Sequence, residues 1–232
     1  MQENGPERED VKHELFAVLD PAAHPDVVLA SSSSGLPPSA IACGCPHHPE
    51  RLVVGHPFNL PHLIPLVEVV PGERTAADVV GRAMAFYAAL GKHSIRLRAE
   101  VPGHVANRLQ AALRQEAYSL VERGVGTVAN IDTAISHGPG LRWAVLGPFL
   151  NQHLSGGAGG IAHILEHLGP PTQQRWRDLR DVTLTPELVT TLAAGVDDEL
   201  ANAGVTDTTE LVARRDAVLT ALLAAKSRTD LP

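Results

Sequence analysis

Aromatic residues, basic residues and long apolar runs are all scarce in this chain of 232 residues. Only 3% of the residues are aromatic and the formal net charge is -7, so a basic groove with stacking rings for nucleic acid is not supported. No run of about eighteen apolar residues occurs, so we expect no membrane-spanning helix. We therefore expect a cytoplasmic protein that acts on neither nucleic acid nor membrane.

Cysteine is equally scarce. The two cysteines, Cys43 and Cys45, are too close in sequence for an ordinary disulfide between neighbouring elements, which fits a reducing compartment. His47, His48 and Glu50 follow and could be considered as metal ligands. A short connection before a strand offers no fixed ligand geometry and no second cysteine pair exists, so we expect no metal site.

The rest of the composition is that of an ordinary globular protein, with 44% hydrophobic and 19% charged residues. Helical and strand patterns alternate over residues 1–100, which predicts an α/β domain. Helices are expected over residues 11–19, 39–43 and 76–90, and strands over residues 26–31, 51–56, 67–70 and 94–99. Residues 101–232 predict an all-α domain, with helices over residues 105–123, 130–136, 143–154, 160–168, 171–179, 186–203 and 207–227.

Two apolar, β-branched runs carry groups that can exchange protons. One run extends from Arg51 to His56, and the other extends from Leu66 through Glu68 and ends at Pro71. Both have the length and composition of buried strands, where an ionised carboxylate is costly unless it is paired. A carboxylate beside a histidine fixes the imidazole tautomer and lets it accept a proton near neutral pH. Taken alone, His56 favours a strand-end histidine bonded to a backbone carbonyl over a catalytic residue.

Four segments together resemble motifs of the 3-hydroxyacyl-CoA dehydrogenase family, which includes lambda-crystallin, a gulonate dehydrogenase, and carnitine dehydrogenase. These segments are His56-Pro-Phe-Asn59, Leu66-Val-Glu68-Val, Val27-Val-Leu-Ala-Ser31-Ser-Ser-Ser34 and Val101-Pro-Gly-His-Val-Ala-Asn107-Arg108. The resemblance implies a partial Rossmann-like NAD-binding domain followed by a helical domain like the C-terminal domain of 6-phosphogluconate dehydrogenase. It departs from the family at His104, where Phe is usual, and at Leu60, where Pro is frequent.

The resemblance also implies roles for individual residues. His56 would take the proton from the substrate's 3-hydroxyl while hydride leaves the same carbon for nicotinamide, and Glu68 would orient the imidazole. Ser34 would hold the substrate oxygen, and Asn107 would contact the reacting oxygen or the nicotinamide. The positions that match cofactor contacts are Ser31, Ser32 and Lys12.

Ordinary structural interpretations remain open for several of these residues. Ser34 ends a run of serines whose hydroxyls can bond local backbone, and Asn107 is otherwise an indifferent helix former. Lys12 could be a solvated charge on an exposed helix face. Arg142 lies in Gly138-Pro-Gly140-Leu-Arg142-Trp, a form that resembles the lambda-crystallin and carnitine dehydrogenase branch. It could clamp the free carboxylate of a small 3-hydroxy acid, or pair with an aspartate of another helix.

One element that the resemblance implies is missing from the 232 residues. Family members open with a strand, a GxGxxG turn and a helix that hold the dinucleotide pyrophosphate. Residues 1–12 already resemble the stretch after the fourth strand, so the N-terminal half of the domain would be absent and the NAD site incomplete. Gly156-Gly-Ala-Gly159-Gly160 has no apolar strand before it and predicts a helix–helix loop instead.

Three functions are compatible with these observations. The first is NAD-dependent oxidation of a 3-hydroxyacyl-CoA or small 3-hydroxy acid by a homodimer formed through the helical domain, with the sequence as given truncated at its N-terminus. A half sheet would expose a strand edge and a large apolar surface, which favours this reading. The second is a lyase or hydrolase that uses the same His56/Glu68 pair without a cofactor. The third is a non-catalytic dimerisation module or a subunit whose sheet a separate chain completes.

Overall fold

The structure is a computed structural model that describes residues 1–229 and 231. The chain divides into two compact units, Met1–Ala111 and Ala112–Pro232. The first unit is α/β and the second is helical, which confirms the predicted fold class. The division falls inside helix α4 (Ala106–Glu122), beyond the boundary near Glu100 that the sequence favours, and that boundary stays a prediction.

The first unit is built on a five-stranded sheet with the strands in sequential order. They are β1 (Gln2–Glu3), β2 (Leu29–Ser31), β3 (Leu52–Pro57), β4 (Leu66–Pro71) and β5 (His93–Arg96). Strands β1, β2 and β3 pair in parallel, β3 and β4 pair antiparallel, and β4 and β5 pair in parallel. The sequence pattern did not predict β1, because a strand of two polar residues has no periodicity to detect.

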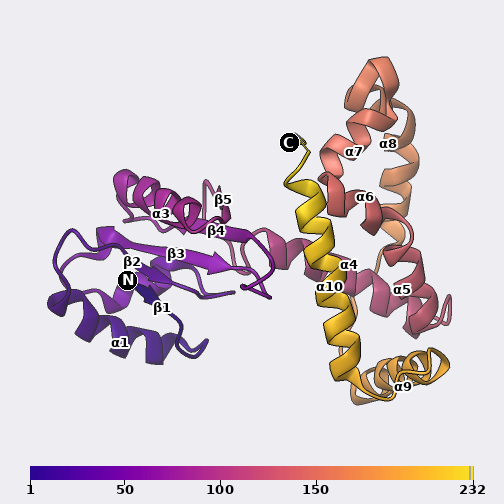
Figure 1. Ribbon diagram of the computed structural model, residues 1–232, viewed down its shortest axis with the longest axis horizontal. Coiled ribbons are helices and arrows are strands. Elements are labelled where there is room, and N and C mark those ends of the chain that lie inside the picture. The colour runs from indigo at the N-terminus through magenta and orange to yellow at the C-terminus, as the bar shows by residue number, and fades with distance from the viewer. Residues whose placement is uncertain (230, 232) are drawn as a thin grey trace. The chain divides into compact units, whose positions relative to one another are not determined.

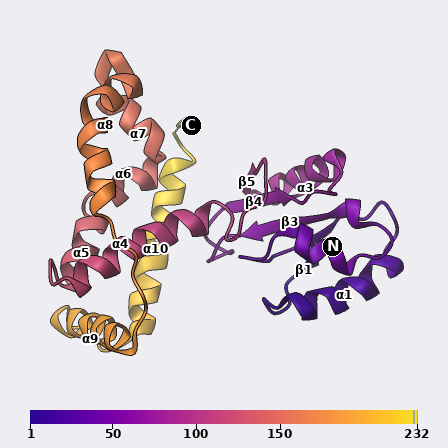
Figure 2. The ribbon, with the colours of Figure 1, turned by 180° about the vertical axis from the view of Figure 1, so that it is seen from behind.

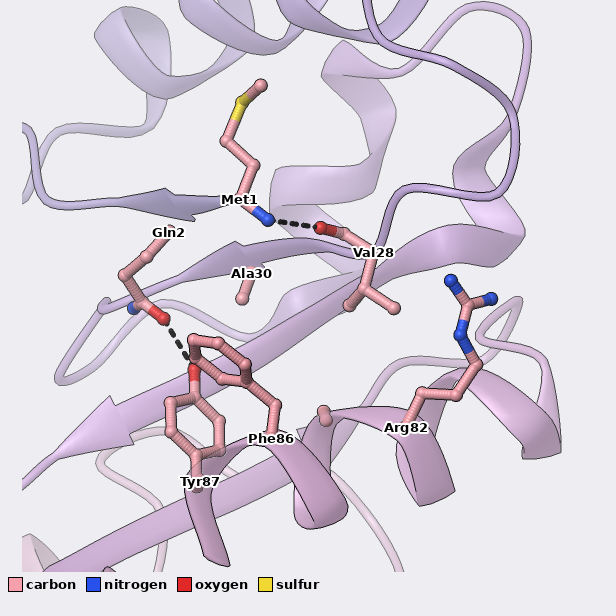
Figure 3. A pocket seen from close by; sticks show the side chains of 8 residues that line it. Met1, Gln2, Val28, Ala30, Arg82, Phe86 and Tyr87 are labelled. Atoms are coloured by element: carbon pink, nitrogen blue, oxygen red, sulfur yellow. Dashed lines mark hydrogen bonds between the residues drawn. The ribbon is translucent and has the colours of Figure 1, made fainter. Parts of the chain in front are cut away.

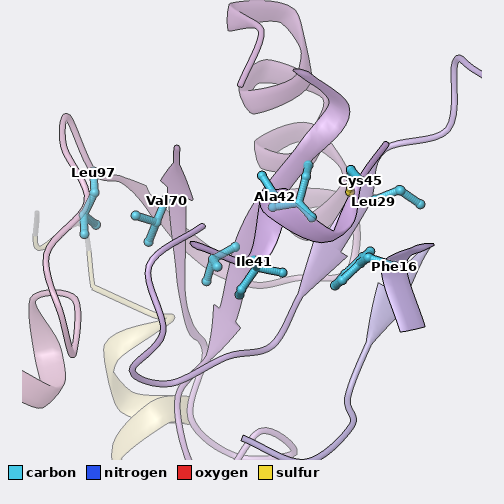
Figure 4. Packing of buried hydrophobic residues seen from close by; sticks show 9 residues of the cluster. Phe16, Leu29, Ile41, Ala42, Cys45, Val70 and Leu97 are labelled. Carbon is cyan, nitrogen blue, oxygen red and sulfur yellow. The ribbon is translucent and has the colours of Figure 1, made fainter. Parts of the chain in front are cut away.

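Helices cover both faces of this sheet. Helix α1 (Glu9–Ala22) and the short α2 (Pro38–Ile41) lie on one face, and α3 (Ala77–Ala89) lies on the other (Figures 1 and 2). Alternate strand residues serve the two cores. Figure 4 shows the first core, which includes Phe16 and Ile41. Leu52 and Val54 belong to this cluster, whereas Val53 packs in the second cluster with Val80. Burial on both faces explains why β3 and β4 have nearly continuous apolar sequences.

A buried ion pair fixes the C-terminal end of α1. Asp20 Oδ1 lies 2.9 Å from Arg51 Nη2, and Asp20 Oδ2 accepts hydrogen bonds from the amides of His47 and His48 at 2.7 and 3.0 Å. Burial raises the pKa of Asp20, but these amides and Arg51 outweigh it and hold the pKa below the ordinary value. Asp20 therefore holds the backbone of the loop at His47 and His48. Among the described residues, no group of three His, Cys, Asp or Glu side chains could hold a metal ion.

The second unit consists of helices that follow α4. They are α5 (Val128–Ser136), α6 (Pro139–Val145), α7 (Pro148–Ser155), α8 (Gly160–Asp178), α9 (Pro186–Asn202) and α10 (Thr208–Lys226). Two predicted boundaries are wrong. Residues 143–154 belong to two helices, because Gly147-Pro148 ends one and opens the next. Residues 160–178 form one helix that continues through Pro170-Pro171, held in place by packing against α7. The predicted glycine loop is a 3-10 turn, Gly157–Gly159, which follows α7 rather than a strand.

Apolar faces of the second unit remain uncovered. Among its described residues, Leu188 is the one large apolar side chain that is buried, whereas Phe149 is 74% exposed and Trp176 is 63% exposed. None of the helices described has the length and apolar character needed to cross a membrane. A single copy of this unit therefore leaves much of its apolar surface in contact with water.

Candidate active site

The predicted histidine and carboxylate face each other across the sheet. His56 lies near the end of β3 and Glu68 lies on β4, and the register pairs them directly. His56 Nδ1 lies 3.0 Å from Glu68 Oε2, and both side chains are buried. Because a carboxylate accepts hydrogen bonds, Nδ1 carries the hydrogen and Nε2 is left as the basic nitrogen of the imidazole.

The second oxygen of Glu68 is held by backbone. Glu68 Oε1 accepts hydrogen bonds from the amides of Val105 and Ala106, at 2.9 and 3.0 Å, where α4 begins. Burial raises the pKa of Glu68, but the His56 ring and these two amides outweigh it and hold the pKa below its usual range. Glu68 is therefore an ionised, fixed carboxylate that can balance a positive charge on His56.

The serine segment, residues 31–35, and Asn107 also lie together. The side-chain amide of Asn107 donates to the Ser34 carbonyl at 3.0 Å, and Ser34 itself is exposed. Within the described part of the chain, no hydrogen bond engages the Ser34 hydroxyl. Ser34 can thus present its hydroxyl to a ligand, while Asn107 fixes its backbone.

The predicted cofactor residues Ser31 and Lys12 are engaged within the protein. Lys12 Nζ lies 3.1 and 2.9 Å from the two carboxylate oxygens of Glu3, and Ser31 Oγ donates to Glu3 Oε2 at 2.6 Å. Lys12 is only 1% exposed, so the alternative of a solvated charge on an exposed helix face is wrong. Ser32 is half-buried and donates its amide to the Glu3 carbonyl at 2.9 Å. A contact between these three residues and a cofactor stays a prediction.

Two carboxylates that no sequence pattern singled out, Glu3 and Glu7, organise this region. Glu3 neutralises Lys12, and Glu7 Oε1 accepts hydrogen bonds from Ser33 Oγ and from the amides of Gly35 and Leu36 at 2.6, 2.8 and 3.2 Å. Burial raises the pKa of Glu7, but these donors and Lys12 outweigh it and lower the pKa. Both residues lie in a polar N-terminal stretch, where no pattern distinguishes them from solvated acids.

Arg142 lies in the second unit, on α6. It lines a cavity of about 690 Å³ together with Trp143, Phe149 and Trp176. The ion pairs formed by the described residues do not include Arg142, so the alternative of an Arg–Asp pair between helices is not found. The guanidinium is thus available to an external carboxylate.

A smaller cavity of about 260 Å³ lies at the β1 edge of the sheet, against α3 (Figure 3). Its lining is mainly apolar and includes Val28 and Phe86. The terminal amine of Met1 donates to the Val28 carbonyl at 2.8 Å, and Tyr87 hydrogen-bonds Gln2. No predicted site residue lines this cavity, so it is separate from the His56–Glu68 pair.

Comparison with known proteins gives consistent matches along the chain. Family models for the 3-hydroxyacyl-CoA dehydrogenase NAD binding domain and C-terminal domain match residues 1–101 and residues 103–197. An L-carnitine dehydrogenase of Streptomyces coelicolor is 49% identical over 98% of this chain and 70% of its own length. A 3-hydroxyacyl-CoA dehydrogenase of Gibberella moniliformis is 46% identical over 98% of this chain and 71% of its own length.

A solved structure has the same fold. The 5-formyl-3-hydroxy-2-methylpyridine 4-carboxylic acid 5-dehydrogenase, described as an NAD+-dependent dismutase, superposes with a TM-score of 0.82 at 28% identity. The match covers 99% of this chain and 73% of that one. The chain therefore corresponds to about seven tenths of each of these proteins.

Proposed function

Because the chain belongs to the 3-hydroxyacyl-CoA dehydrogenase family of NAD-dependent oxidoreductases acting on CH–OH groups, we propose that it supplies the base for oxidation of a 3-hydroxyl. The observation that carries this proposal is the buried pair of His56 and Glu68, joined at 3.0 Å. The carboxylate is fixed by two backbone amides, so the imidazole is held in one orientation with Nε2 free.

In the proposed reaction, His56 Nε2 accepts the proton of the substrate hydroxyl and becomes an imidazolium. Glu68 balances this charge, and the Ser34 hydroxyl hydrogen-bonds the reacting oxygen. NAD, when bound, supplies the acceptor for the hydride that leaves the same carbon, so the products are a ketone, NADH and a proton. General base catalysis of this kind contributes about 10²–10⁴-fold to the rate.

The residues present fit part of a dinucleotide site. Rossmann-type sheets bind dinucleotides at the carboxyl ends of their parallel strands. Glu3 and Ser31 are the last residues of β1 and β2, and Ser32 follows β2. Among the described residues, the Gly157–Gly159 turn lies between helices and cannot serve as the pyrophosphate turn. We infer that a strand–turn–helix unit outside the given sequence completes the site at the β1 edge, where the apolar cavity lies against α3.

We favour a small 3-hydroxy acid as the substrate over a CoA thioester. Arg142 supports this choice, because its guanidinium lines a cavity without a carboxylate partner among the described residues. A free carboxylate fits that guanidinium with two hydrogen bonds.

We also propose that two copies associate through the second unit. Its exposed apolar side chains outside the Arg142 cavity, including Val196 and Val218, are too numerous for a surface that remains in water. A stable dimer interface buries about 1,200–2,000 Å² in total, which such helical faces can supply.

The test is a reconstituted oxidation assay. The chain is mixed with a separately expressed segment that carries the glycine-turn half of the Streptomyces coelicolor relative, and NADH is followed with 3-hydroxybutyrate or L-carnitine as substrate. We expect NADH formation in the mixture, and a loss of about 10²–10⁴-fold in His56→Gln. Unchanged activity in His56→Gln would refute the proposed base. Turnover of a 3-oxo acid without NAD would favour the lyase or hydrolase instead.

A further inference from the structure

His104 is a second histidine at the candidate active site. Its side chain is 0% exposed, and its ring centroid lies 5.4 Å from that of His56 with the planes tilted by 50°. The residue follows Gly103, and both have left-handed backbone conformations, with φ of 52° at His104 and 76° at Gly103. A side chain in this region is uncommon outside Asn, Asp and His, so the chain turns sharply at a cost that the surrounding contacts must offset.

The turn that contains His104 is bonded to three successive carbonyls of the serine segment. His104 Nε2 lies 3.0 Å from the Ser33 carbonyl, Asn107 Nδ2 lies 3.0 Å from that of Ser34, and the Gly103 amide lies 3.3 Å from that of Gly35. The next two amides of the same turn hold Glu68 Oε1. This single turn therefore joins the serine segment to the His56–Glu68 pair.

The hydrogen-bond chemistry of His104 defines its tautomer. A carbonyl only accepts, so the hydrogen lies on Nε2, and Nδ1 is a buried nitrogen without a hydrogen-bond partner among the described residues. Phenylalanine could fill the same space beside His56 without leaving a nitrogen unpartnered. Phenylalanine could not donate to the Ser33 carbonyl, which is the polar contact that the histidine side chain makes with the described residues.

We propose that His104 is a positioning residue that locks the serine segment to the His56–Glu68 pair through its hydrogen bond to Ser33. The proposal rests on the proposed function, because the lock matters when Ser34 and His56 act on the same hydroxyl. The hydrogen bond from His104 to Ser33 holds Ser34 at a fixed distance from His56. Loss of the His104 donor therefore affects the alignment of a substrate rather than His56 itself.

The experiment compares His104→Phe with His104→Gln in the full chain. Phenylalanine keeps a flat ring and removes the donor, whereas the glutamine amide places an N–H as many bonds from Cα as His104 Nε2. Amide hydrogen exchange is measured at Gly103 and, as a control for the fold, at Val53 and Val54 in β3. The side-chain amide signals of Asn107 and the imidazole nitrogen signals of His56 are recorded by NMR.

We expect Gly103 to exchange at least tenfold faster in His104→Phe, with shifted Asn107 side-chain signals and unchanged protection in β3. His104→Gln should restore the wild-type values. In the reconstituted assay, the Phe variant should lose about tenfold in kcat/KM and the Gln variant should recover it.

Three results would overturn the proposal. The first is wild-type exchange and signals in His104→Phe, and the second is failure of His104→Gln to restore them while β3 stays protected. The third is loss of β3 protection in both variants, which would make His104 a residue of the core. The exchange and NMR signals need no turnover, so an absence of NADH in every sample would count against the proposed function alone.

Discussion

His56 Nδ1 and Glu68 Oε2 lie 3.0 Å apart because the two residues are directly paired on antiparallel strands. The distance is therefore set by the sheet register rather than by a loop. Val67 and Val69, on either side of Glu68, fix that register, since a shift by one position would turn both away from their core. The stability of the sheet and the geometry of the candidate base are thus coupled.

Neutralising the carboxylate should impair the base and leave the fold largely intact. In Glu68→Gln, the side chain keeps an oxygen for the amides of Val105 and Ala106 but no longer balances an imidazolium at His56. We expect the rate of NADH formation in the reconstituted assay to fall by about 10²-fold or more. Glu73→Gln, at an exposed position, is the matched control and should keep the full rate. Equal rates in both variants would exclude Glu68 from the mechanism.

Lowering the pH should destabilise the first unit, in part because Asp20 becomes protonated. The folded pKa of Asp20 is depressed, so its contribution to stability is present above the unfolded pKa, which is about 3.9, and is lost as the pH falls through the folded value. Asp20→Asn removes this contribution at every pH. We expect the variant to be less stable at pH 7 and to show a flatter loss of stability below about pH 4 in urea titrations. A parallel pH dependence in both proteins would contradict this expectation.

Breaking the buried ion pair from the other side should cost more. Arg51→Met leaves the buried Asp20 carboxylate without its cation, although the His47 and His48 amides remain. We expect a loss of about 3–5 kcal/mol in the free energy of unfolding. Arg98→Met, at an exposed position, should change it by about 0.5 kcal/mol at most. Denaturant unfolding measures the loss in both variants, and equal losses would mean that the Asp20–Arg51 ion pair does not stabilise the fold.

Alanine substitutions at Gly55 and Gly81 should have opposite effects on the stability of the protein. A Cβ added at Gly55 in β3 would clash with the Tyr87 hydroxyl and lie 2.7 Å from its ring, so Gly55→Ala should destabilise the protein by about 1–3 kcal/mol. Gly81 in α3 has nothing within 4 Å of an added Cβ, so Gly81→Ala should stabilise by about 0.5–1 kcal/mol. Thermal unfolding should shift in opposite directions, and a shift of the same sign in both would refute the packing argument.

The two cysteines should react very differently with thiol reagents. Burial raises the pKa of the Cys45 thiol to about 12, whereas Cys43 is exposed. Since the thiolate is the reactive form, iodoacetamide at pH 8 should modify Cys43 in the folded protein and Cys45 only after unfolding. Mass spectrometry of digested samples measures both sites. Labelling of Cys45 at the rate of Cys43 would mean that the α1 face of the sheet opens readily.

Several features of the site could be predicted from sequence because each leaves a local signal. The apolar runs around His56 and Glu68 indicated two buried strands. The motifs that resemble a known family indicated that these two residues belong to the candidate active site. The helix after Pro102 was equally visible in its periodicity. None of these signals gives a distance, so the role of the pair as a base stays a proposal that the assay tests.

The sequence by itself determined the fold class and most strands and helices of the first unit, since periodicity and turn residues are local properties. It did not locate the two-residue β1 or the helix ends around Gly147 and Pro170. Only the tertiary structure decided the pairing of β1, the burial of Lys12 against Glu3 and the bonds from the His104 turn to the serine segment. The Lys12–Glu3 contact joins two residues that are 9 positions apart in the sequence, and the His104–Ser33 contact joins two that are 71 positions apart. Charged and polar side chains of this kind have no periodicity, and whether they are solvated or buried depends on which partner the folded chain brings within hydrogen-bonding distance.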